Sequence, residues 1–160
     1  MTGFSHVSEG GEPRMVDVSG KQVTLRTARA QCLMMLPREV MERLDQGEIH
    51  TPKGAVFQTA MVAGIQAAKR TGELIPLCHP LGLDHCQVRI RVAGEQELVV
   101  ECSASVTART GVEMEALVGA SLAALTIYDM CKAFGHEIQI RETRLVEKTG
   151  GKRDFKQTEF

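Results

Sequence analysis

Four charged residues stand in an otherwise small and apolar stretch, residues 111–134. Glu113 and Glu115 lie near its start, and Asp129 and Lys132 lie near its end. A stretch that is apolar on nearly all sides predicts a buried helix. Charges on a buried helix are costly unless they are paired or take part in chemistry. These four residues are therefore the first candidates for a functional site.

The spacing of these charges indicates two separate groups. At about 100° and 1.5 Å per residue, Glu115, Asp129 and Lys132 share one side of the helix, and Glu113 points elsewhere. Glu115 and Asp129 are then roughly 21 Å apart along the axis, so one helix cannot bring both to a small substrate. Either the two ends have different tasks, or the end of one subunit's helix meets the start of another's. The second case predicts a symmetric oligomer.

Asp129 and Lys132 admit two interpretations. Their i, i+3 spacing near a helix end is typical of a structural ion pair. Alternatively, Lys132 stands in an apolar wall, where burial would lower its pKa and suit it to general acid–base catalysis. The sequence leaves both interpretations open.

A second candidate lies in a loop with two prolines, residues 74–81. Pro76 and Pro80 exclude a helix interior and interrupt any strand ladder. Pro80 also restricts the backbone of His79, which predicts an imidazole held in one direction for substrate binding or proton transfer. The alternative is a packed loop whose histidine faces solvent.

The cysteines and histidines around this loop are residue types that bind metals. Cys78–His79 and His85–Cys86 are adjacent pairs, and adjacent residues of an extended chain point in opposite directions. Their spacing does not match the usual zinc motifs. We therefore expect no metal site.

Three basic positions are candidates for anion binding. Lys53 precedes a helix in a Lys–Gly turn, where backbone N–H groups could meet an anion; residues 69–70 and 148–153 are the others. No Walker P-loop is present. Each position is either a solvated surface charge or part of a pocket on which all three converge.

Composition limits the function classes. Net charge is −1, hydrophobic residues are 43% and aromatic residues 4%, which predicts a soluble domain without a nucleic-acid surface. Five cysteines, an odd number, predict reduced thiols and a cytoplasmic location. The longest apolar run, residues 116–128, is shorter than a bilayer span, so no membrane is expected.

The elements that must position these candidates follow from hydrophobic periodicity. Together they predict an α+β fold in which an antiparallel sheet carries its helices on one face. Strands are expected at 15–18, 22–36, 86–92, 97–107 and 136–147, and helices at 37–46, 56–70 and 111–134. We expect a flexible N-terminal arm at 1–12, a single domain at 13–155 and a C-terminal tail at 156–160.

Six segments carry a resemblance to a known family. They are residues 15–19 with Lys21, Thr24 and Arg26, then 63–71, 74–81, 110–117, 125–133 and 150–152. In their order and in their amino-acid sequences they resemble the MoaC family, the cyclic pyranopterin monophosphate synthases of molybdenum cofactor biosynthesis. The resemblance runs from about residue 4 to residue 155.

The resemblance implies a ferredoxin-like fold, a homohexamer built as a trimer of dimers, and sites between subunits. It implies a lyase that converts 3',8-cyclo-7,8-dihydro-GTP, made by a partner radical enzyme, to cyclic pyranopterin monophosphate and pyrophosphate. No cofactor is expected, and Mg²⁺ with the triphosphate is left open. The alternative is a non-catalytic nucleotide- or metal-binding module of the same fold.

The resemblance also assigns residues. It implies Asp129, Lys53 and Lys132 as catalytic, with the two lysines as the acid–base pair. The implied substrate-binding residues are Leu77, Cys78, His79, Glu113, Met114 and Glu115, to which we add Lys69, Arg70 and Lys152 as phosphate contacts. The segment after Lys152 is one small residue shorter than is usual in the family.

Overall fold

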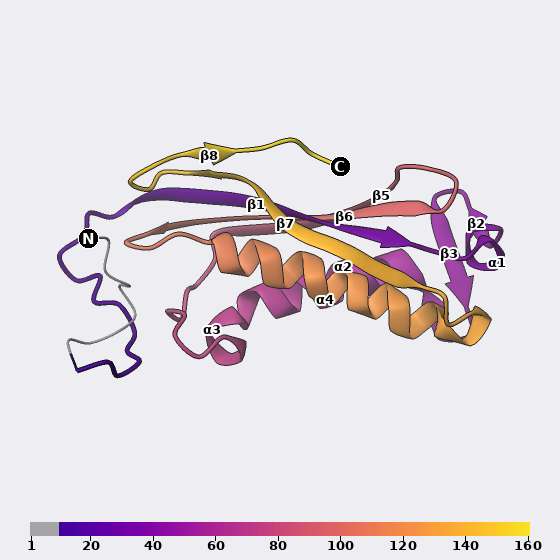
Figure 1. Cartoon of the computed structure of the whole chain (residues 1–160), viewed down its shortest axis with the longest axis horizontal. Coiled ribbons are helices and arrows are strands. Elements are labelled where there is room, and N and C mark those ends of the chain that lie inside the picture. Colours follow the sequence, from indigo (N-terminus) through magenta and orange to yellow (C-terminus); the bar gives the residue numbers. More distant parts are fainter. Residues whose placement is uncertain (1–9) are drawn as a thin grey trace.

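A five-stranded antiparallel sheet and a layer of helices form the main body of the protein (Figure 1). The computed structural model describes residues 10–160, so residues 1–9 of the predicted arm lie outside it. The five-stranded sheet has the order β5-β6-β1-β7-β8. Its strands are β5 (His85–Val92), β6 (Glu97–Ala108), β1 (Thr24–Met35), β7 (Gln139–Thr149) and β8 (Phe155–Lys156).

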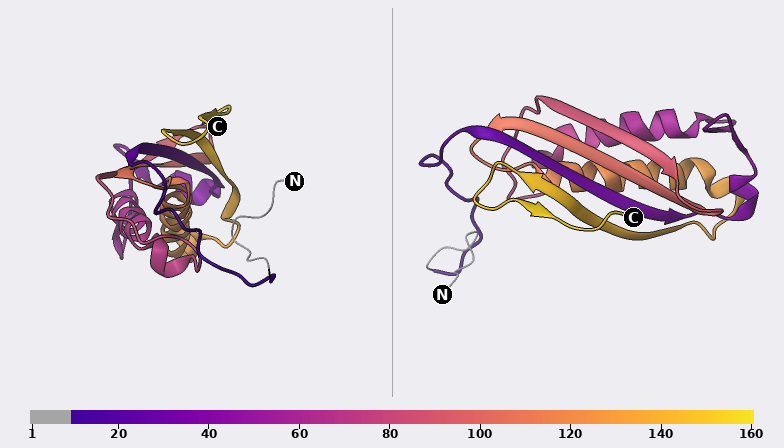
Figure 2. Two further views of the ribbon diagram at one scale, coloured as in Figure 1. Left: turned by 90° about the vertical axis from the view of Figure 1, so that its left-hand side faces the viewer. Right: turned by 90° about the horizontal axis from the view of Figure 1, so that it is seen from above.

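Two long helices, α2 (Val56–Lys69) and α4 (Glu113–Cys131), lie side by side on one face of this sheet (Figures 1 and 2). The remaining elements are short: α1 (Arg38–Met41), β2 (Leu44–Asp45), β3 (Glu48–Thr51), β4 (Gly54–Ala55), α3 (Thr71–Leu74) and the 3-10 turn η1 (Lys132–Phe134). The arrangement is the predicted α+β, ferredoxin-like fold.

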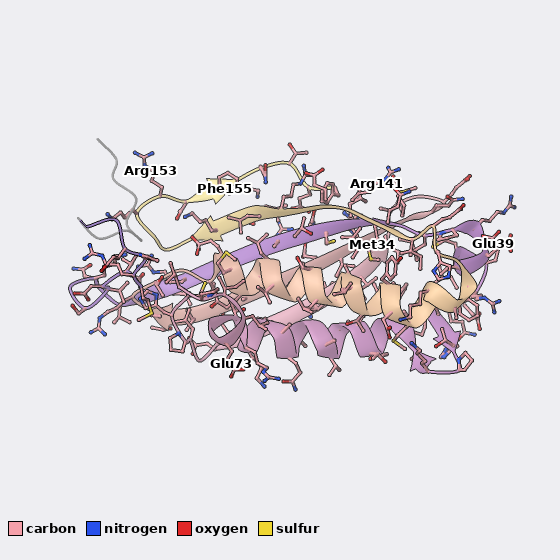
Figure 3. The ribbon with its side chains drawn as sticks, turned by 60° about the horizontal axis from the view of Figure 1, so that its bottom comes forward. Met34, Glu39, Glu73, Arg141, Arg153 and Phe155 are labelled. Carbon is pink, nitrogen blue, oxygen red and sulfur yellow. The ribbon has the colours of Figure 1, made fainter. Side chains whose placement is uncertain are left out.

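Strand β1 is central to the sheet and forms because its side chains alternate. Ala28, Ala30, Cys32 and Met34 point to the helices and are almost fully buried. The strand pairs with β6 along its whole length and with β7 on its other edge. Figure 3 shows Met34 among the side chains between sheet and helices, whereas Glu39, Glu73, Arg141 and Arg153 lie at the periphery. The predicted strand at 22–36 is confirmed.

Helix α4 is the core helix of the domain. With η1 it forms a segment, Glu113–Phe134, that is long and apolar enough to cross a membrane, so the length argument against a span is wrong. Its packing accounts for its composition instead, since α4 contacts α2, β1, β6 and β7. The predicted helices at 56–70 and 111–134 are confirmed.

Two predicted elements differ in the structure. Residues 15–18 are extended but belong to no strand. The helix expected after Pro37 ends at Met41, and a small sheet of β2, β3 and β4 follows. The turn between β2 and β3 has positive φ at Gln46 and Gly47, a conformation that a helix cannot continue through.

The last residues lie over the sheet face that has no helices (Figure 1). Lys156, the first residue of the predicted tail, is part of β8. Further on, Glu159 accepts hydrogen bonds from Arg29, and the backbone N–H of Phe160 donates to Gln31 Oε1 at 3.0 Å. Gln31 is consequently fully buried.

The two long helices approach each other and the sheet through glycines. A Cβ at Gly64 would lie 2.7 Å from the carbonyl oxygen of Gly119, and a Cβ at Gly119 would lie 2.5 Å from Cys102 Sγ. Real Cβ atoms do not come this close to other atoms, so both positions need glycine.

Gly119→Ala should therefore destabilise the fold by about 1–3 kcal/mol, the usual cost of an overpacked core. Helix propensity alone would have the opposite sign and stabilise by about 1 kcal/mol. Urea denaturation measures the difference. Gly20→Ala, at a position with nothing within 4 Å, is the control, and a Gly119→Ala protein as stable as wild type would contradict the packing argument.

Candidate active site

The candidate residues form two groups at opposite ends of α4. One group surrounds the start of the helix, and the other joins its end to the turn before α2 (Figure 1). Within one chain, α4 separates Glu115 from Asp129, as its length predicted. Each group is called a half-site.

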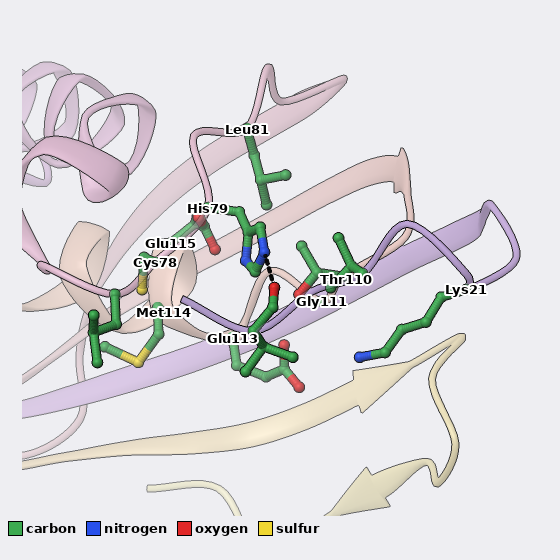
Figure 4. Close-up of a pocket in the computed structure, with 12 residues that line it drawn as sticks. Lys21, Cys78, His79, Leu81, Thr110, Gly111, Glu113, Met114 and Glu115 are labelled. Carbon is green, nitrogen blue, oxygen red and sulfur yellow. Dashed lines mark hydrogen bonds between the residues drawn. The ribbon is translucent and has the colours of Figure 1, made fainter. Parts of the chain in front are cut away.

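The first half-site is a cavity of about 270 Å³, here called the loop pocket (Figure 4). Six of the predicted substrate-binding residues line it: Leu77, Cys78, His79, Glu113, Met114 and Glu115. The proline-bounded loop supplies the first three, and the start of α4 supplies the others. Glu113 and Glu115 both reach the pocket, although we expected Glu113 to point elsewhere.

His79 is fixed by a hydrogen bond to the N-terminal segment. Its Nε2 donates to the backbone oxygen of Val16 at 2.7 Å, so this nitrogen carries a proton (Figure 4). The ring is half-buried, and Val16 and Val18 line the pocket beside it. The alternative of a solvent-facing histidine is wrong, and the extended residues 15–18 serve as a wall of the pocket rather than as a strand.

The two glutamates of the loop pocket have different electrostatic environments. Glu115 is only 4% exposed, and burial, with the charge of Glu113 nearby, raises the pKa of its carboxyl. Glu113 instead accepts a hydrogen bond from Lys148 Nζ at 2.9 Å. The pocket thus holds one paired carboxylate and one carboxyl that binds a proton more readily than usual.

Cys78 also binds its proton more tightly. Burial and the charge of Glu115 raise the pKa of its thiol. A thiol in this state is a weak nucleophile. Cys78 therefore lines the pocket as an uncharged side chain.

A neighbouring hollow of about 300 Å³ contains the predicted phosphate contacts Lys69 and Arg70. Glu115 lines this hollow as well as the loop pocket. Arg70 is already paired with Glu73 at 3.0 Å. Lys152 is exposed in the turn between β7 and β8 and lines neither cavity.

The second half-site is a cluster of three residues, Lys53, Asp129 and Lys132, here called the lysine cluster. Lys132 Nζ lies 2.8 Å from Asp129 Oδ1, and Lys53 Nζ lies 3.0 Å from Asp129 Oδ2. Lys53 also donates to the backbone oxygen of Asp129 at 3.1 Å. The turn between β3 and β4 places Lys53 here, and Gly54 completes that turn at φ +114°. The structure therefore joins three predicted catalytic residues that come from two distant parts of the chain.

The charges of the cluster stabilise one another. Hydrogen bonds from Lys132 and Lys53, with their positive charges, lower the pKa of Asp129 to about 2. In return, the Asp129 carboxylate raises the pKa of Lys132. All three side chains are about half exposed. The expectation that burial lowers the pKa of Lys132 is wrong for this chain, and the expected i, i+3 ion pair with Asp129 is present.

The expectation that backbone N–H groups at the start of α2 would meet an anion beside Lys53 is wrong. The carboxylate of Glu48, in β3, accepts hydrogen bonds from the backbone N–H groups of Phe57 at 2.7 Å and Gln58 at 3.1 Å. These N–H groups are thus already satisfied by an anion of the protein itself. Within one chain the three basic positions do not meet, since Lys53 precedes α2 and Lys69 is its last residue.

Among residues 10–160, no group of three or more His, Cys, Asp or Glu is arranged to hold a metal ion. All five cysteines are free thiols.

The structure adds residues that sequence reasoning did not assign to the site. Lys21 and Thr110 line the loop pocket, and Lys148 pairs with Glu113 across its edge. Lys21 and Thr110 belong to segments that carry the family resemblance, and Lys148 belongs to the basic run. Membership in those segments was the sequence feature that could have indicated a place in the site.

Comparisons with known proteins agree with the resemblance. The model of the MoaC family matches residues 15–151. The chain is 52% identical over 152 residues to the cyclic pyranopterin monophosphate synthase of Xanthomonas oryzae pv. oryzae, covering 95% of this chain and 92% of that relative. It is 51% identical to the enzyme of the same name from Xanthomonas campestris pv. campestris, with the same coverage.

A longer relative is the molybdenum cofactor biosynthesis bifunctional protein of Synechocystis sp. It is 47% identical over 159 residues, which cover 97% of this chain and 46% of that protein. The match over most of the chain, with the lysine cluster and the loop pocket formed from the resembling segments, shows that the chain belongs to the MoaC family.

Proposed function

We propose that this protein is a cyclic pyranopterin monophosphate synthase. It converts 3',8-cyclo-7,8-dihydro-GTP to cyclic pyranopterin monophosphate and releases pyrophosphate, in molybdenum cofactor biosynthesis. The observation that carries the proposal is the meeting of Lys53 and Lys132 on Asp129. Two ammonium groups held at one carboxylate are suited to a phosphate-bearing substrate.

The charges of the cluster favour particular roles. Because Asp129 raises the pKa of Lys132, this lysine enters the reaction protonated, as a general acid rather than a base. A pyrophosphate leaving group needs its developing charge neutralised, and Lys53 with Lys132 supplies that charge. The rearrangement exchanges no electrons with a partner, so it calls for no redox cofactor, and Mg²⁺ on the triphosphate is compatible with it.

The loop pocket is proposed to hold the non-phosphate part of the substrate. His79 offers a ring in a fixed direction, and Glu115 offers a buried carboxyl with a raised pKa. A carboxyl that holds its proton more readily than usual, beside a ring in a fixed direction, suits the proton transfers of a ring opening and reclosure. Lys69 and Arg70, in the neighbouring hollow, remain our candidates for phosphate contacts, with Lys152 as a less direct one.

The two half-sites are proposed to combine across a subunit interface. The outer surface of the helical layer exposes large apolar side chains between them: Leu125 of α4 is 52% exposed and Val62 of α2 is 59% exposed. A two-fold contact pairs each surface with itself, so the start of one α4 would face the end of its partner's. We propose that such dimers assemble into a homohexamer with sites between subunits.

The partners follow from the proposed chemistry. The substrate must come from a radical enzyme that cyclises GTP, and the pathway is that named for the Synechocystis relative. Neither nucleic acid nor a membrane is part of the proposal, and we place the protein in the cytoplasm, where five free thiols stay reduced.

The lysine cluster can be tested by substitution. Lys53→Ala and Lys132→Ala should each lower turnover of the cyclised dihydro-GTP at least about 100-fold, because each removes a proton-transfer or charge-stabilising group. Pyrophosphate release and pterin formation are the readouts. Arg38→Ala, which removes an exposed cation from an i,i+4 pair, is the matched control. Substrate binding without any product in the wild-type protein would favour the non-catalytic module instead.

The electrostatic coupling within the cluster predicts a pH effect. Asp129→Asn removes the carboxylate that raises the pKa of Lys132, so the lysine should lose its proton at lower pH. If Lys132 acts as an acid, the alkaline limb of kcat/KM should move to lower pH. An unmoved alkaline limb in a folded Asp129→Asn protein would remove Lys132 from the acid role.

Shared sites predict rescue between variants. A Lys53→Ala/Lys132→Ala protein lacks one half-site, and a His79→Ala/Glu115→Gln protein lacks the other, so each alone should be inactive. After subunit exchange, mixed oligomers should recover turnover, because some interfaces then combine two intact half-sites. A mixture of Lys53→Ala with Lys132→Ala, both in the same half-site, should recover none. Rescue that fails in demonstrably mixed oligomers would count against the shared site.

A further inference from the structure

Two cysteines outside the proposed site lie in contact on neighbouring strands. Cys86 is on β5 and Cys102 is on β6, and their sulfur atoms are 3.8 Å apart. The strand register pairs Cys86 with Ala104 and Val88 with Cys102, so the two cysteines are diagonal neighbours. Both point to the helix-covered face, where they belong to the core.

The two thiols differ in exposure. Cys102 is fully buried, and α4 comes so close above it that Gly119 has no room for a side chain. Cys86 is partly exposed, because β5 is an edge strand of the sheet. A small oxidant can therefore reach Cys86 but not Cys102 directly.

The two thiols also differ in acidity. A hydrogen bond from the Cys102 thiol, together with the positive charge of Lys69, lowers the pKa of Cys86. The same contact and burial raise the pKa of Cys102. Of the two thiols, Cys86 therefore loses its proton more readily. A partly exposed thiol of lowered pKa in contact with a second thiol is the arrangement of a peroxide-reactive cysteine and its resolving partner.

We propose that Cys86 and Cys102 form a peroxide-sensitive dithiol that oxidises to a cross-strand disulfide. The Cys86 sulfur attacks one oxygen of hydrogen peroxide, the O–O bond breaks, and Cys86 becomes a sulfenic acid while water is released. Cys102 then attacks the Cys86 sulfur: the S–S bond forms, the S–O bond breaks, and a second water leaves with the Cys102 proton. The two thiols lose two electrons and two protons, and the peroxide gains them.

The strand geometry makes the disulfide reversible. Its sulfurs must move from 3.8 Å to about 2.05 Å apart. Diagonal neighbours on antiparallel strands have Cα atoms about 7–8 Å apart, beyond the usual disulfide range, so the edge strand must shift toward β6. Disulfides formed against such resistance are readily reduced, and a dithiol reductant should return the pair to thiols.

The proposal is independent of the proposed synthase reaction. Cys86 and Cys102 line neither the loop pocket nor the neighbouring hollow, and the pair meets the site only through the charge of Lys69. The chemistry can therefore be tested without substrate.

The test is peptide mapping: the folded protein is treated with hydrogen peroxide, the peroxide is removed, and the protein is then denatured in iodoacetamide and digested with trypsin without reductant. We expect a disulfide between peptides 71–89 and 92–109, which disappears when dithiothreitol is added before alkylation. Cys78 shares the first peptide with Cys86, so fragmentation must place the bond. Full alkylation of Cys86 and Cys102 after peroxide, or a bond through Cys78, would overturn the proposal.

Variants separate the two steps. Cys86→Ser should give no cross-link. Cys131→Ala, which removes a buried thiol at the end of α4, should keep the cross-link. In Cys102→Ala the reaction should stop at a Cys86 sulfenic acid, which dimedone traps. A protein with Cys102 intact that accumulates dimedone-reactive Cys86 without forming the cross-link would overturn the resolving role of Cys102.

Discussion

The burial of helix α4 is the constraint on which the rest of the structure depends. Its middle, residues 116–128, contains no charged residue, because the helix packs against four strands of the large sheet and against α2. Charged groups are tolerated only where the helix meets loops, at its two ends. Reactive side chains are therefore placed at opposite ends of the domain by the same packing that makes the core. In the proposed oligomer, a small substrate that needs both ends is bound by two copies of the chain.

The two ends complement each other electrostatically. At the start of α4, burial keeps Glu115 closer to its neutral form. At the end, two lysines keep Asp129 ionised and Asp129 keeps Lys132 protonated. One half-site thus offers a proton-holding carboxyl and a fixed imidazole, and the other offers positive charge. A substrate with a heterocycle at one end and a triphosphate at the other matches this division.

Much of the fold could be predicted from local sequence, and the reason is periodicity. Strand β1 and helices α2 and α4 are long enough for alternation or small-residue packing to identify them. The helix after Pro37 was predicted to be too long. Its end is set by the turn at Gln46 and Gly47 and by the small β2-β3-β4 sheet. Neither feature can be recognised from the helical pattern of apolar residues. Residues 15–18 alternate like a strand, but no sheet edge receives them.

The site was less accessible to local reasoning, because its contacts join distant parts of the chain. Lys53 and Asp129 are 76 residues apart, and no spacing rule connects them. Glu48 lies in β3, nine residues before Phe57, and accepts a hydrogen bond from its backbone N–H. The sequence around the helix start does not reveal this contact, so the N–H groups were expected to be free for an anion. The family resemblance grouped Lys53, Asp129 and Lys132 correctly, whereas periodicity alone offered only the local pair of Asp129 and Lys132.

The exposure of the lysine cluster suits it to exchange partners during binding. Asp129 is 55% exposed and both lysines are 51% exposed, and ion pairs in contact with water contribute little to stability. Asp129 therefore holds the two ammonium groups in place without binding them strongly. An arriving phosphate, with more charge and more acceptor oxygens than one carboxylate, can take both lysines at small cost. Closing the site with the partner's loop pocket would then remove water, and the same charges would act more strongly on the leaving pyrophosphate.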